Sequence, residues 1–381
     1  MIFAIPYILF FLLFLVLAVI VQQRKEDVAL CRKIEYGAIC LFFLFFGFRG
    51  FIWHDWTIYY PHFMDCEWGD FLEYDYFESR EPGWLLLQLL CKSVVENYQF
   101  LVLVTTAINT ALLIRFFRRY SYNLLLGLAI YLVFSGFVLS INLMRNSLAI
   151  LLFINALPYV EERRFWPFLG ICLLASMFHL SALTFIPLYF ILNLHINKYI
   201  FAGVILAAHV LLFVRFSPIL ELAGTFLGDN EIIASKLASY EEYGKRAGSR
   251  FVILFRLITC ALVFCYYERI QEQNKHNHLF INSLMCYIVG MYLTAEFTEV
   301  SNRVGIIFDY CHWILWMYLL KSFRYSGNQL LYFGYSLFYF VFYISICIFQ
   351  PVCSYQNYLL GNCGSYEENL ANFNKTFKEP E

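Results

Sequence analysis

Charged residues are scarce in this chain: they make up 14% of its 381 amino acids, whereas hydrophobic residues make up 61%. An ordinary soluble domain carries about 25% charged residues. A soluble fold of the present composition would need an apolar exterior, which lipid tolerates and water does not. The formal net charge of −1 also provides no basic excess for binding nucleic acid. We therefore expect a membrane protein that does not bind nucleic acid.

Several binding motifs are absent as well. The sequence has no Walker loop, no Gly-x-Gly dinucleotide turn and no Cys/His spacing typical of zinc. The acidic residues of 50–82 lack the spacing and the glycine of a calcium-binding EF-hand loop. The sequence thus indicates no metal, no nucleotide and no other cofactor.

A cleavable signal peptide is not expected either. The first apolar run, residues 1–21, has no basic region before it and no small-residue cleavage site after it. Its basic cluster follows the run instead, which is the opposite of the polarity of a signal peptide. We interpret the run as a retained helix whose N-terminus faces outward.

Apolar runs are what the sequence has in abundance. A helix needs about 20 residues to cross the hydrocarbon core of a bilayer. The candidate spans are 3–21, 34–48, 98–117, 122–140, 143–160, 165–178, 180–194, 199–216, 250–268, 278–297, 303–320 and 329–349. No internal repeat, low-complexity stretch or linker divides the chain. We expect one all-α, multi-pass membrane domain over residues 1–381, with about 12 transmembrane helices.

Lysine and arginine in the short loops predict the orientation, because cytoplasmic loops are enriched in both. With the N-terminus outside, the inner loops hold Arg24, Lys25, Arg32, Lys33, Arg115, Arg118, Arg119, Arg163, Arg164, Lys198, Arg269, Lys275, Lys321 and Arg324. The expected outer segments are the acidic and aromatic loop 49–83, the loop 217–249 and the C-terminal tail 350–381.

Residues 84–95 decide on which side of the membrane all later loops lie. They are apolar but, at about 12 residues, too short to span a bilayer. If they crossed with the next run as a hairpin, every later loop would change side and the basic clusters would lie outside. We therefore interpret 84–95 as an interfacial or re-entrant segment.

Ionisable residues in or beside the apolar runs are candidates for function, because a charge in a membrane segment is costly unless it faces protein, water or a ligand. In the predicted orientation Arg49, Arg145, His179 and Arg303 collect on the outer side, and Arg256 lies about six residues into its span. Several guanidiniums on one face would suit phosphate, which arginine binds through two hydrogen bonds. The alternatives are ordinary: interfacial or snorkelling arginines, and for Arg256 an ion pair with a neighbouring helix.

His179 lies between the runs 165–178 and 180–194, each about 21 Å long at 1.5 Å per residue. That length falls short of the roughly 30 Å hydrocarbon core. Two short helices that meet at residues 178–181 would place His179 below the outer surface, where it must line a cavity. Alternatively, residues 165–194 form one crossing and a surface helix, with His179 as its cap.

The outer loop 51–83 mixes acids with aromatic residues, among them Trp53, Trp56 and Tyr59. Aromatic faces beside carboxylates suit carbohydrate, although an aromatic belt with a solvated acidic loop is the alternative. Most of the twelve cysteines lie within spans, where they act as small apolar residues. Cys353 and Cys363 both lie in the predicted outer tail, where an oxidising compartment would favour a disulfide between them.

A family resemblance rests on short motifs in a fixed order. They are Arg49-Gly50, Asp55-Trp56 with Tyr59, Glu81-Pro82-Gly83-Trp84, Arg145-Asn146-Ser147-Leu148-Ala149, Phe178-His179-Leu180-Ser181-Ala182-Leu183, Asn302-Arg303, and Pro351 with Tyr355. Together they cover most of residues 40–360, and the chain resembles the EpsG family of Wzy-like bacterial polysaccharide polymerases. The family often has Gly-x-Asp-Tyr after the first arginine, where this chain has Ile52-Trp53-His54-Asp55-Trp56.

The resemblance implies a polymerase of undecaprenyl-diphosphate-linked repeat units at the outer face of the bacterial cytoplasmic membrane. It also implies a metal-independent glycosyltransferase with the GT-C-like architecture of O-antigen ligases and polymerases, serving capsule, exopolysaccharide or O-antigen synthesis. A leaving lipid diphosphate needs fixed cations, a role that suits Arg145 and Arg303 together with Arg49 and Arg256. An acceptor hydroxyl needs a general base, for which the candidates are His179, Asp55 and Glu81.

Two other functions agree with embedded charges. A polysaccharide O-acyltransferase also uses a histidine and arginines in a helical bundle. A flippase or transporter of lipid-linked sugars would alternate its access, usually with repeated broken helices, and only the pair near 165–194 is visible here. The sequence leaves open which sugars are joined and whether a protein that regulates chain length binds the polymerase.

Overall fold

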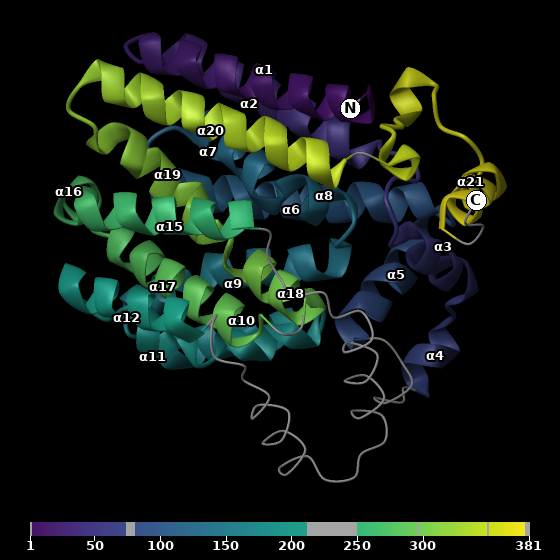
Figure 1. Ribbon diagram of the computed structural model, residues 1–381. Helices are drawn as coiled ribbons and strands as arrows, with labels where there is room; N and C mark the ends of the chain where they lie inside the picture. The colour runs from purple at the N-terminus through teal and green to yellow at the C-terminus, as the bar shows by residue number, and fades with distance from the viewer. Residues whose placement is uncertain (1, 74–80, 212–249, 296–297, 349, 378–381) are drawn as a thin grey trace. The chain divides into compact units, whose positions relative to one another are not determined.

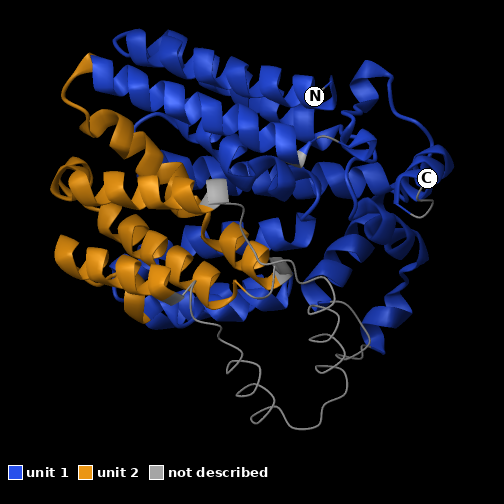
Figure 2. Cartoon of the chain, in the orientation of Figure 1, with its two compact units in different colours: residues 1–189, 327–381 blue, residues 190–326 orange. Residues whose placement is uncertain are grey.

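The computed structural model describes residues 2–73, 81–211, 250–295, 298–348 and 350–377, and all regular elements in these ranges are helices. The predicted outer loop 217–249 lies outside the described residues. The chain forms two compact units (Figure 2): unit 1 comprises Met1–Tyr189 and Gly327–Glu381, and unit 2 comprises Phe190–Ser326. The expectation of a single domain stays a prediction, and each unit is described by itself.

Unit 1 is built of helices of very different length (Figure 1). The longer ones are α1 (Ile5–Gln23), α2 (Val28–Gly47), α3 (Trp56–Asp65), α5 (Pro82–Val94), α6 (Tyr98–Tyr120), α9 (Met144–Glu161), α10 (Phe165–Ser176), α20 (Ser326–Cys347) and α21 (Tyr366–Phe377). The shorter elements are η1 (Ile2–Ala4), α4 (Trp68–Leu72), α7 (Leu124–Tyr131), the π-helical turn η2 (Leu132–Gly136), α8 (Phe137–Ile141), η3 (Leu180–Phe185), η4 (Pro351–Cys353) and η5 (Tyr358–Leu360).

Capping residues set several helix starts. The Asp27 carboxylate accepts the Leu30 amide at 2.9 Å, so α2 begins six residues before the expected span 34–48. Asn97 and Asn123 cap α6 and α7 in the same way. A π turn interrupts the expected span 122–140, and there a Cβ on Gly136 would lie 2.3 Å from the Tyr131 carbonyl oxygen. The backbone therefore approaches too closely for any residue except glycine.

Four helical stretches are long and apolar enough to cross a membrane: Ile2–Gln23, Tyr98–Tyr120, Leu124–Ile141 and Ser326–Ile346. Together with the apolar composition they indicate a membrane protein. The expected count of twelve spans is not matched by helices of this length among the described residues. Helix α18 (Thr298–Phe308) and helix α19 (Tyr310–Ser322) divide the expected span 303–320 on either side of Asp309.

Helix α9 is the centre of unit 1. Thirteen of its 18 residues are buried, on all sides of the helix, which is typical of a helix enclosed by others. It packs mainly on α10 and α6. Inside this contact Asn155 donates its amide to the Leu112 carbonyl at 3.1 Å and to the Leu151 carbonyl at 2.8 Å. The first of these bonds holds the second half of α9 against α6.

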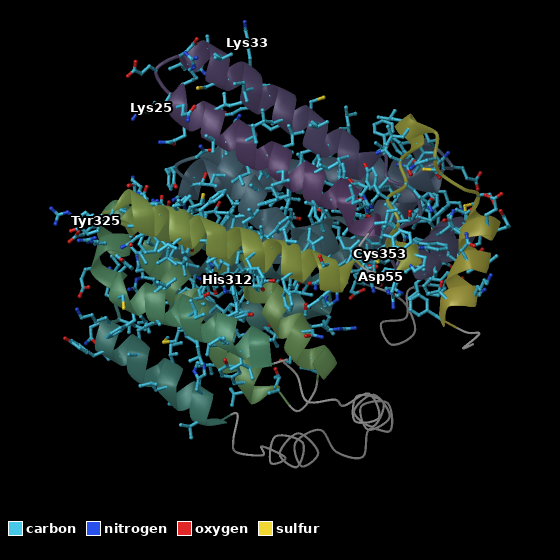
Figure 3. The ribbon with its side chains drawn as sticks, turned by 45° about the horizontal axis from the view of Figure 1, so that its top comes forward. Lys25, Lys33, Asp55, His312, Tyr325 and Cys353 are labelled. Carbon is cyan, nitrogen blue, oxygen red and sulfur yellow. The ribbon has the colours of Figure 1, made fainter. Side chains whose placement is uncertain are left out.

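Unit 1 has two chemically different ends (Figure 3). Lys25 and Lys33 lie at one end of the long helices, and Asp55 and Cys353 lie at the other. We call these the basic end and the site end. Arg118 lines a cavity with Lys25 and Arg32, so the C-terminus of α6 belongs to the basic end. The charge segregation expected from the sequence is therefore present within unit 1.

Helix α5 lies wholly at the site end. At 13 residues it is about 20 Å long. Its last turn contacts the α3–α4 region, where Lys92 Nζ binds the Met64 and Cys66 carbonyls at 2.6 and 2.9 Å. Shortly after it, Gln99 Nε2 binds the Gly47 carbonyl at the end of α2, at 2.5 Å. The last turn of α5 and the residues that follow it therefore contact segments of the site end, and the interfacial or re-entrant nature of 84–95 stays a prediction.

The C-terminal tail is folded onto the outer loop. Tyr366 of α21 stacks on Tyr60 with ring centroids 4.1 Å apart, and Phe373 contacts the Trp56 ring at 6.1 Å. The sequence left open whether Cys353 and Cys363 form a disulfide, and the structure shows no bond between these two sulfurs. Cys353 is buried in a 3-10 turn whose carbonyl accepts the Tyr7 hydroxyl at 2.9 Å, so packing rather than a covalent bond fixes the tail.

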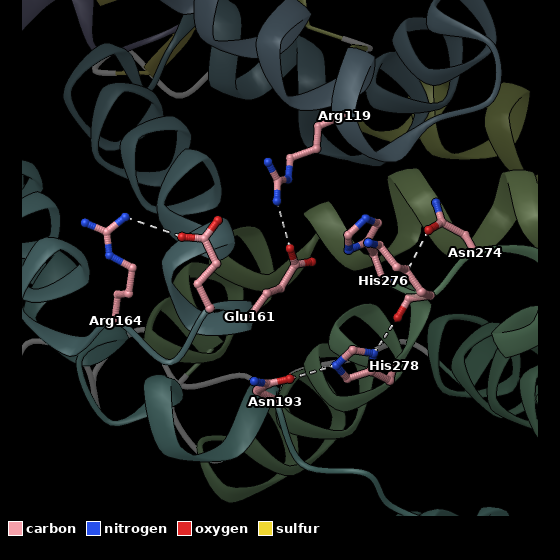
Figure 4. A network of polar contacts seen from close by, with 9 residues as sticks. Arg119, Glu161, Arg164, Asn193, Asn274, His276 and His278 are labelled. Carbon is pink, nitrogen blue, oxygen red and sulfur yellow. Dashed lines mark hydrogen bonds and ion pairs between the residues drawn. The ribbon is translucent and has the colours of Figure 1, made fainter.

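Unit 2 consists of α11 (Leu188–Leu192), which begins in unit 1, α12 (Lys198–Leu211), α15 (Arg250–Cys265), α16 (Tyr267–Gln273), α17 (Asn277–Leu293), α18 and α19. Its buried polar residues tie helix α17 to the chain before α12. Asn282 Nδ2 donates to the Leu192 and Leu194 carbonyls at 2.9 and 2.7 Å. His278 Nε2 and Asn193 Oδ1 are 2.9 Å apart (Figure 4).

Candidate functional site

The expected break at His179 is present as a helical hairpin. Helix α10 ends at Ser176, and the chain returns through η3, so that the Tyr189 ring lies 5.1 Å from Phe165 and 5.4 Å from Phe168. The two limbs are therefore antiparallel and short. We call residues 177–181 the hairpin tip.

Helix α5 begins against the hairpin tip. The Gly83 and Trp84 amides donate to the Met177 carbonyl at 2.8 and 3.2 Å. A Cβ on Gly83 would lie 2.8 Å from both the carbonyl oxygen and the Cβ of Met177. Glycine is required because two backbones meet there, and the contact fixes Glu81, the N-cap residue of α5, beside the tip.

Glu81 joins three parts of unit 1. Its Oε2 pairs with Arg145 Nη1 of α9 at 2.5 Å, and its Oε1 accepts the Leu180 amide of the tip at 3.3 Å. The Glu81 and Arg145 side chains are 20% and 22% exposed, so the pair is mostly shielded from water without being sealed. Glu81 holds the guanidinium and the hairpin tip in one arrangement.

Tyr59 and Asp55 complete the cluster. The Arg145 guanidinium carbon lies 5.7 Å from the centre of the Tyr59 ring, within the range of a cation–π contact. The Tyr59 hydroxyl donates to Asp55 Oδ2 at 3.4 Å. Burial, together with the Asp55 carboxylate, raises the pKa of Tyr59 to about 12, so its hydroxyl remains a hydrogen-bond donor at neutral pH.

His179 occupies the hairpin tip in a defined orientation. Its Nδ1 lies 2.7 Å from Ser181 Oγ and accepts the Ser181 amide at 3.3 Å, so the imidazole caps η3. The next residue, Leu180, contacts Glu81 through its amide. The structure thus brings together five of the sequence-predicted candidates from distant segments: Asp55, Tyr59, Glu81, Arg145 and His179.

Arg49 lies at the same end but is fully engaged in packing. It is 4% exposed, and its Nη1 donates to the Phe46 carbonyl at 2.6 Å and to the Thr106 hydroxyl at 3.1 Å. Its backbone also pairs with Asn357 of the tail. Burial lowers the pKa of Arg49 to about 10, so the guanidinium stays charged at neutral pH. In this conformation it closes the C-terminus of α2 and is not presented to a ligand.

Arg256 and Arg303 belong to unit 2. Arg256 is 8% exposed, donates from Nε to the Tyr287 hydroxyl at 3.1 Å, and lies over the Tyr287 ring at 5.5 Å. Arg303 is exposed on α18. Their assignment to a diphosphate stays a prediction.

The three aromatic residues expected to bind sugar differ in exposure. Trp56 and Tyr59 are 7% and 4% exposed, so neither ring face is open to a sugar in this conformation. Trp53 is half-buried and has a φ of 75°, a strained value for a bulky residue. Strain of this kind gathers at functional sites. The Trp53 amide donates to the Val352 carbonyl at 2.9 Å. A sugar-stacking role stays a prediction for Trp53.

Asn142 is a site residue that the sequence interpretation missed. Its Oδ1 accepts the amides of His54 and Asp55 at 3.0 and 2.9 Å, which fixes the Asp55 backbone relative to the start of α9. The sequence signal that could have found it is an asparagine in an otherwise apolar stretch, three residues before Arg145. In the structure Asn142 is buried. Ser181, whose hydroxyl contacts His179, is a second missed site residue, and it lies in the Phe178–Leu183 motif.

The cluster lies at the site end of unit 1. It combines the Arg145 guanidinium, two carboxylates, a phenol and an imidazole. Such a set can bind an anionic group, orient a hydroxyl and accept its proton. Among the described residues no group of three or more His, Cys, Asp or Glu side chains has the arrangement to hold a metal ion.

Comparison with protein families gives one match, in which the model described as EpsG family covers residues 36–360. This range includes every residue of the cluster. The comparisons with curated proteins and with solved structures give no match.

Proposed function

Because this chain belongs to the EpsG family of Wzy-like polysaccharide polymerases, we propose that it is a glycosyltransferase that polymerises undecaprenyl-diphosphate-linked repeat units. The acceptor hydroxyl of one lipid-linked unit attacks the anomeric carbon of the growing chain. The bond between that carbon and the diphosphate oxygen breaks, and the lipid diphosphate leaves with the electron pair. The hydroxyl proton passes to a protein base.

The observation that carries the proposal is the position of Arg145 between Glu81, Tyr59 and the hairpin tip. A leaving diphosphate develops negative charge, which a pre-oriented guanidinium stabilises most where water is scarce. Arg145 is oriented by an ion pair and by an aromatic ring before any substrate arrives. We assign the diphosphate to Arg145, and the roles of Arg49, Arg256 and Arg303 stay predictions from the sequence.

We assign the general base to His179 rather than to Glu81 or Asp55. Both oxygens of Glu81 are already used, one by Arg145 and one by the Leu180 amide, so its role is to position the guanidinium. Asp55 accepts the Tyr59 hydroxyl. Histidine titrates near neutral pH, as a base that takes and releases a proton in each cycle should. The Ser181 contact at Nδ1 fixes the ring for that task.

The proposal is tested with purified protein in detergent and a synthetic undecaprenyl-diphosphate oligosaccharide, without ATP or added metal. The wild type should produce a ladder of chain lengths on a gel. Arg145→Ala should lower the rate at least about 100-fold, the usual cost of removing a group that stabilises transition-state charge. Arg145→Lys should recover little, because an ammonium lacks the two-pronged geometry. His179→Gln should lower the rate about 10²–10⁴-fold.

Arg164→Ala is the matched control, since Arg164 is exposed at the other end of its helical hairpin and pairs with Glu162 at 3.4 Å. It should leave the rate within about twofold of the wild type. In cells, the Arg145 and His179 variants should accumulate single repeat units on the surface glycan. Unchanged chain length with altered acetyl content would indicate an O-acyltransferase and overturn the proposal. No elongation by the purified wild type, together with loss of sugar translocation in the variants, would indicate a flippase.

A further inference from the structure

A cavity of about 710 Å³ lies at the basic end of unit 1, away from the candidate site. Helices α2, α6 and α9 form its walls. Its volume is within the 300–1,000 Å³ range typical of small-molecule sites. The proposed polymerase chemistry uses no residue of this cavity.

The walls of the cavity are apolar, and its rim is basic. Ile39 of α2, Ile114 of α6, and Ile154 and Pro158 of α9 supply aliphatic surface. Tyr36, 61% exposed, stands at the edge, as tyrosine does at a membrane interface. A purely polar ligand such as free phosphate gains nothing from such walls, whereas a molecule with hydrocarbon chains does.

Three arginines within one and a half turns of α6 supply the charge: Arg115, Arg118 and Arg119 line the cavity and are exposed. Arg119 pairs with Glu161 at 3.0 Å (Figure 4). No ion pair is formed by Arg115 or Arg118 within the described part of the chain. Two guanidiniums are therefore uncompensated by a carboxylate, above an apolar wall.

A second cavity of about 370 Å³ adjoins the first, because Arg118 lines both. It adds Lys25 of the α1–α2 turn and Arg32 of α2, against the single carboxylate of Glu35. The basic rim thus continues from α6 to α2. Five basic residues in all line the two cavities: Lys25, Arg32, Arg115, Arg118 and Arg119.

We propose that these cavities bind an anionic glycerophospholipid. The phosphate would lie against Arg115 and Arg118, which can each donate two parallel hydrogen bonds. The acyl chains would follow the apolar wall between α2, α6 and α9. Basic pockets between membrane helices on the cytoplasmic side recognise lipid headgroups in this way. The bound lipid would fix the packing of α6, whose other end supports Arg49 through Thr106.

The test measures lipid binding and needs no polymerase activity. Purified full-length protein is delipidated in detergent and titrated with dioleoyl phosphatidylglycerol, dioleoyl phosphatidylcholine, inorganic phosphate or undecaprenyl phosphate, and bound lipid is counted by native mass spectrometry. Phosphatidylglycerol should bind at least tenfold more tightly than phosphatidylcholine. The double variant Arg115→Gln, Arg118→Gln should bind phosphatidylglycerol roughly 30-fold more weakly, because each arginine contributes to the binding free energy near an anionic lipid headgroup.

Lys33→Gln is the control, since Lys33 is exposed at the same end but lines neither cavity; its binding should match that of the wild type. Equal affinity for phosphatidylcholine, or unchanged affinity in the double variant, would overturn the proposal. So would preferential binding of undecaprenyl phosphate, which would identify a carrier site instead. The comparison of lipids on the wild type stands even if the double variant folds poorly.

Discussion

The Glu81 carboxylate makes two contacts, and both partners are far from Glu81 in the sequence. Arg145 is 64 residues away and Leu180 is 99 residues away. The sequence placed Glu81 and Arg145 among the candidates through their motifs, but nothing in a motif shows that an acid and a base neutralise each other. That pairing depends on how α5, α9 and the hairpin tip pack, so it could be found only from the structure.

Replacing Glu81 by glutamine tests the positioning role. Glu81→Gln keeps a carbonyl oxygen for the Leu180 amide but leaves the mostly buried Arg145 without its counter-charge. We expect the free energy of unfolding to fall by about 1–3 kcal/mol, the cost of an unsatisfied charged partner, and the elongation rate to fall with it. Thermal unfolding in detergent measures the first quantity and the gel ladder the second.

The control for this change is Glu162→Gln, which removes the partner of Arg164. Both side chains of that pair are about half exposed, at 58% and 49%, and exposed pairs contribute little. Its unfolding temperature should therefore stay at the wild-type value. An equal fall of the unfolding temperature in Glu81→Gln and Glu162→Gln would mean that the ion pair of Glu81 with Arg145 stabilises the fold no more than a surface pair does.

At the scale of elements, the close approach of α5 to the hairpin tip positions the site. The short limbs before and after His179 were expected from the lengths of two apolar runs, and the structure contains them as α10 and η3. The expectation failed for 303–320, where the apolar run continues but the helix divides at Asp309. Hydropathy reports how apolar a segment is, and a single internal turn barely changes it.

Gly83→Ala tests the contact between α5 and the tip. Its new methyl group would lie 2.8 Å from backbone and side-chain atoms of Met177, so one of the two elements must shift. Overpacking of this kind typically costs about 1–3 kcal/mol. We expect a lower unfolding temperature and slower elongation, because Glu81 and Arg145 would be displaced together.

Gly170→Ala is the matched change on the same hairpin. A Cβ on Gly170 meets no atom within 4 Å, and alanine is favoured over glycine in a helix by about 1 kcal/mol. This variant should be as stable as the wild type or slightly more so. If Gly83→Ala behaved in the same way, the close approach at Met177 would not hold in solution.

For the whole molecule, the separation of a basic end from a site end was expected from the loop charges and is present in unit 1. The apolar composition and the lysine and arginine positions are properties of the sequence alone, which is why they predicted it. The folding of the tail over the outer loop was not expected, since Tyr366 and Phe373 lie in a polar segment. Their ring partners are about 300 residues earlier, and no local pattern reports a contact at that distance.

The membrane orientation of this charge pattern is the last prediction. Single cysteines are introduced at exposed positions, as Asp65→Cys, Glu96→Cys, Lys33→Cys and Glu272→Cys, and intact cells are treated with an impermeant maleimide. The positive-inside rule places positions 65 and 96 outside and positions 33 and 272 inside, so only the first two should be labelled above the wild-type background. Labelling of all four after permeabilisation shows that each thiol is reactive.

Because residues 84–95 lie between positions 65 and 96, labelling at 65 without labelling at 96 would mean that this segment crosses the bilayer. Glu81 and the hairpin tip would then have to lie on opposite faces of the membrane, and Glu81 could not reach Arg145 as it does in unit 1.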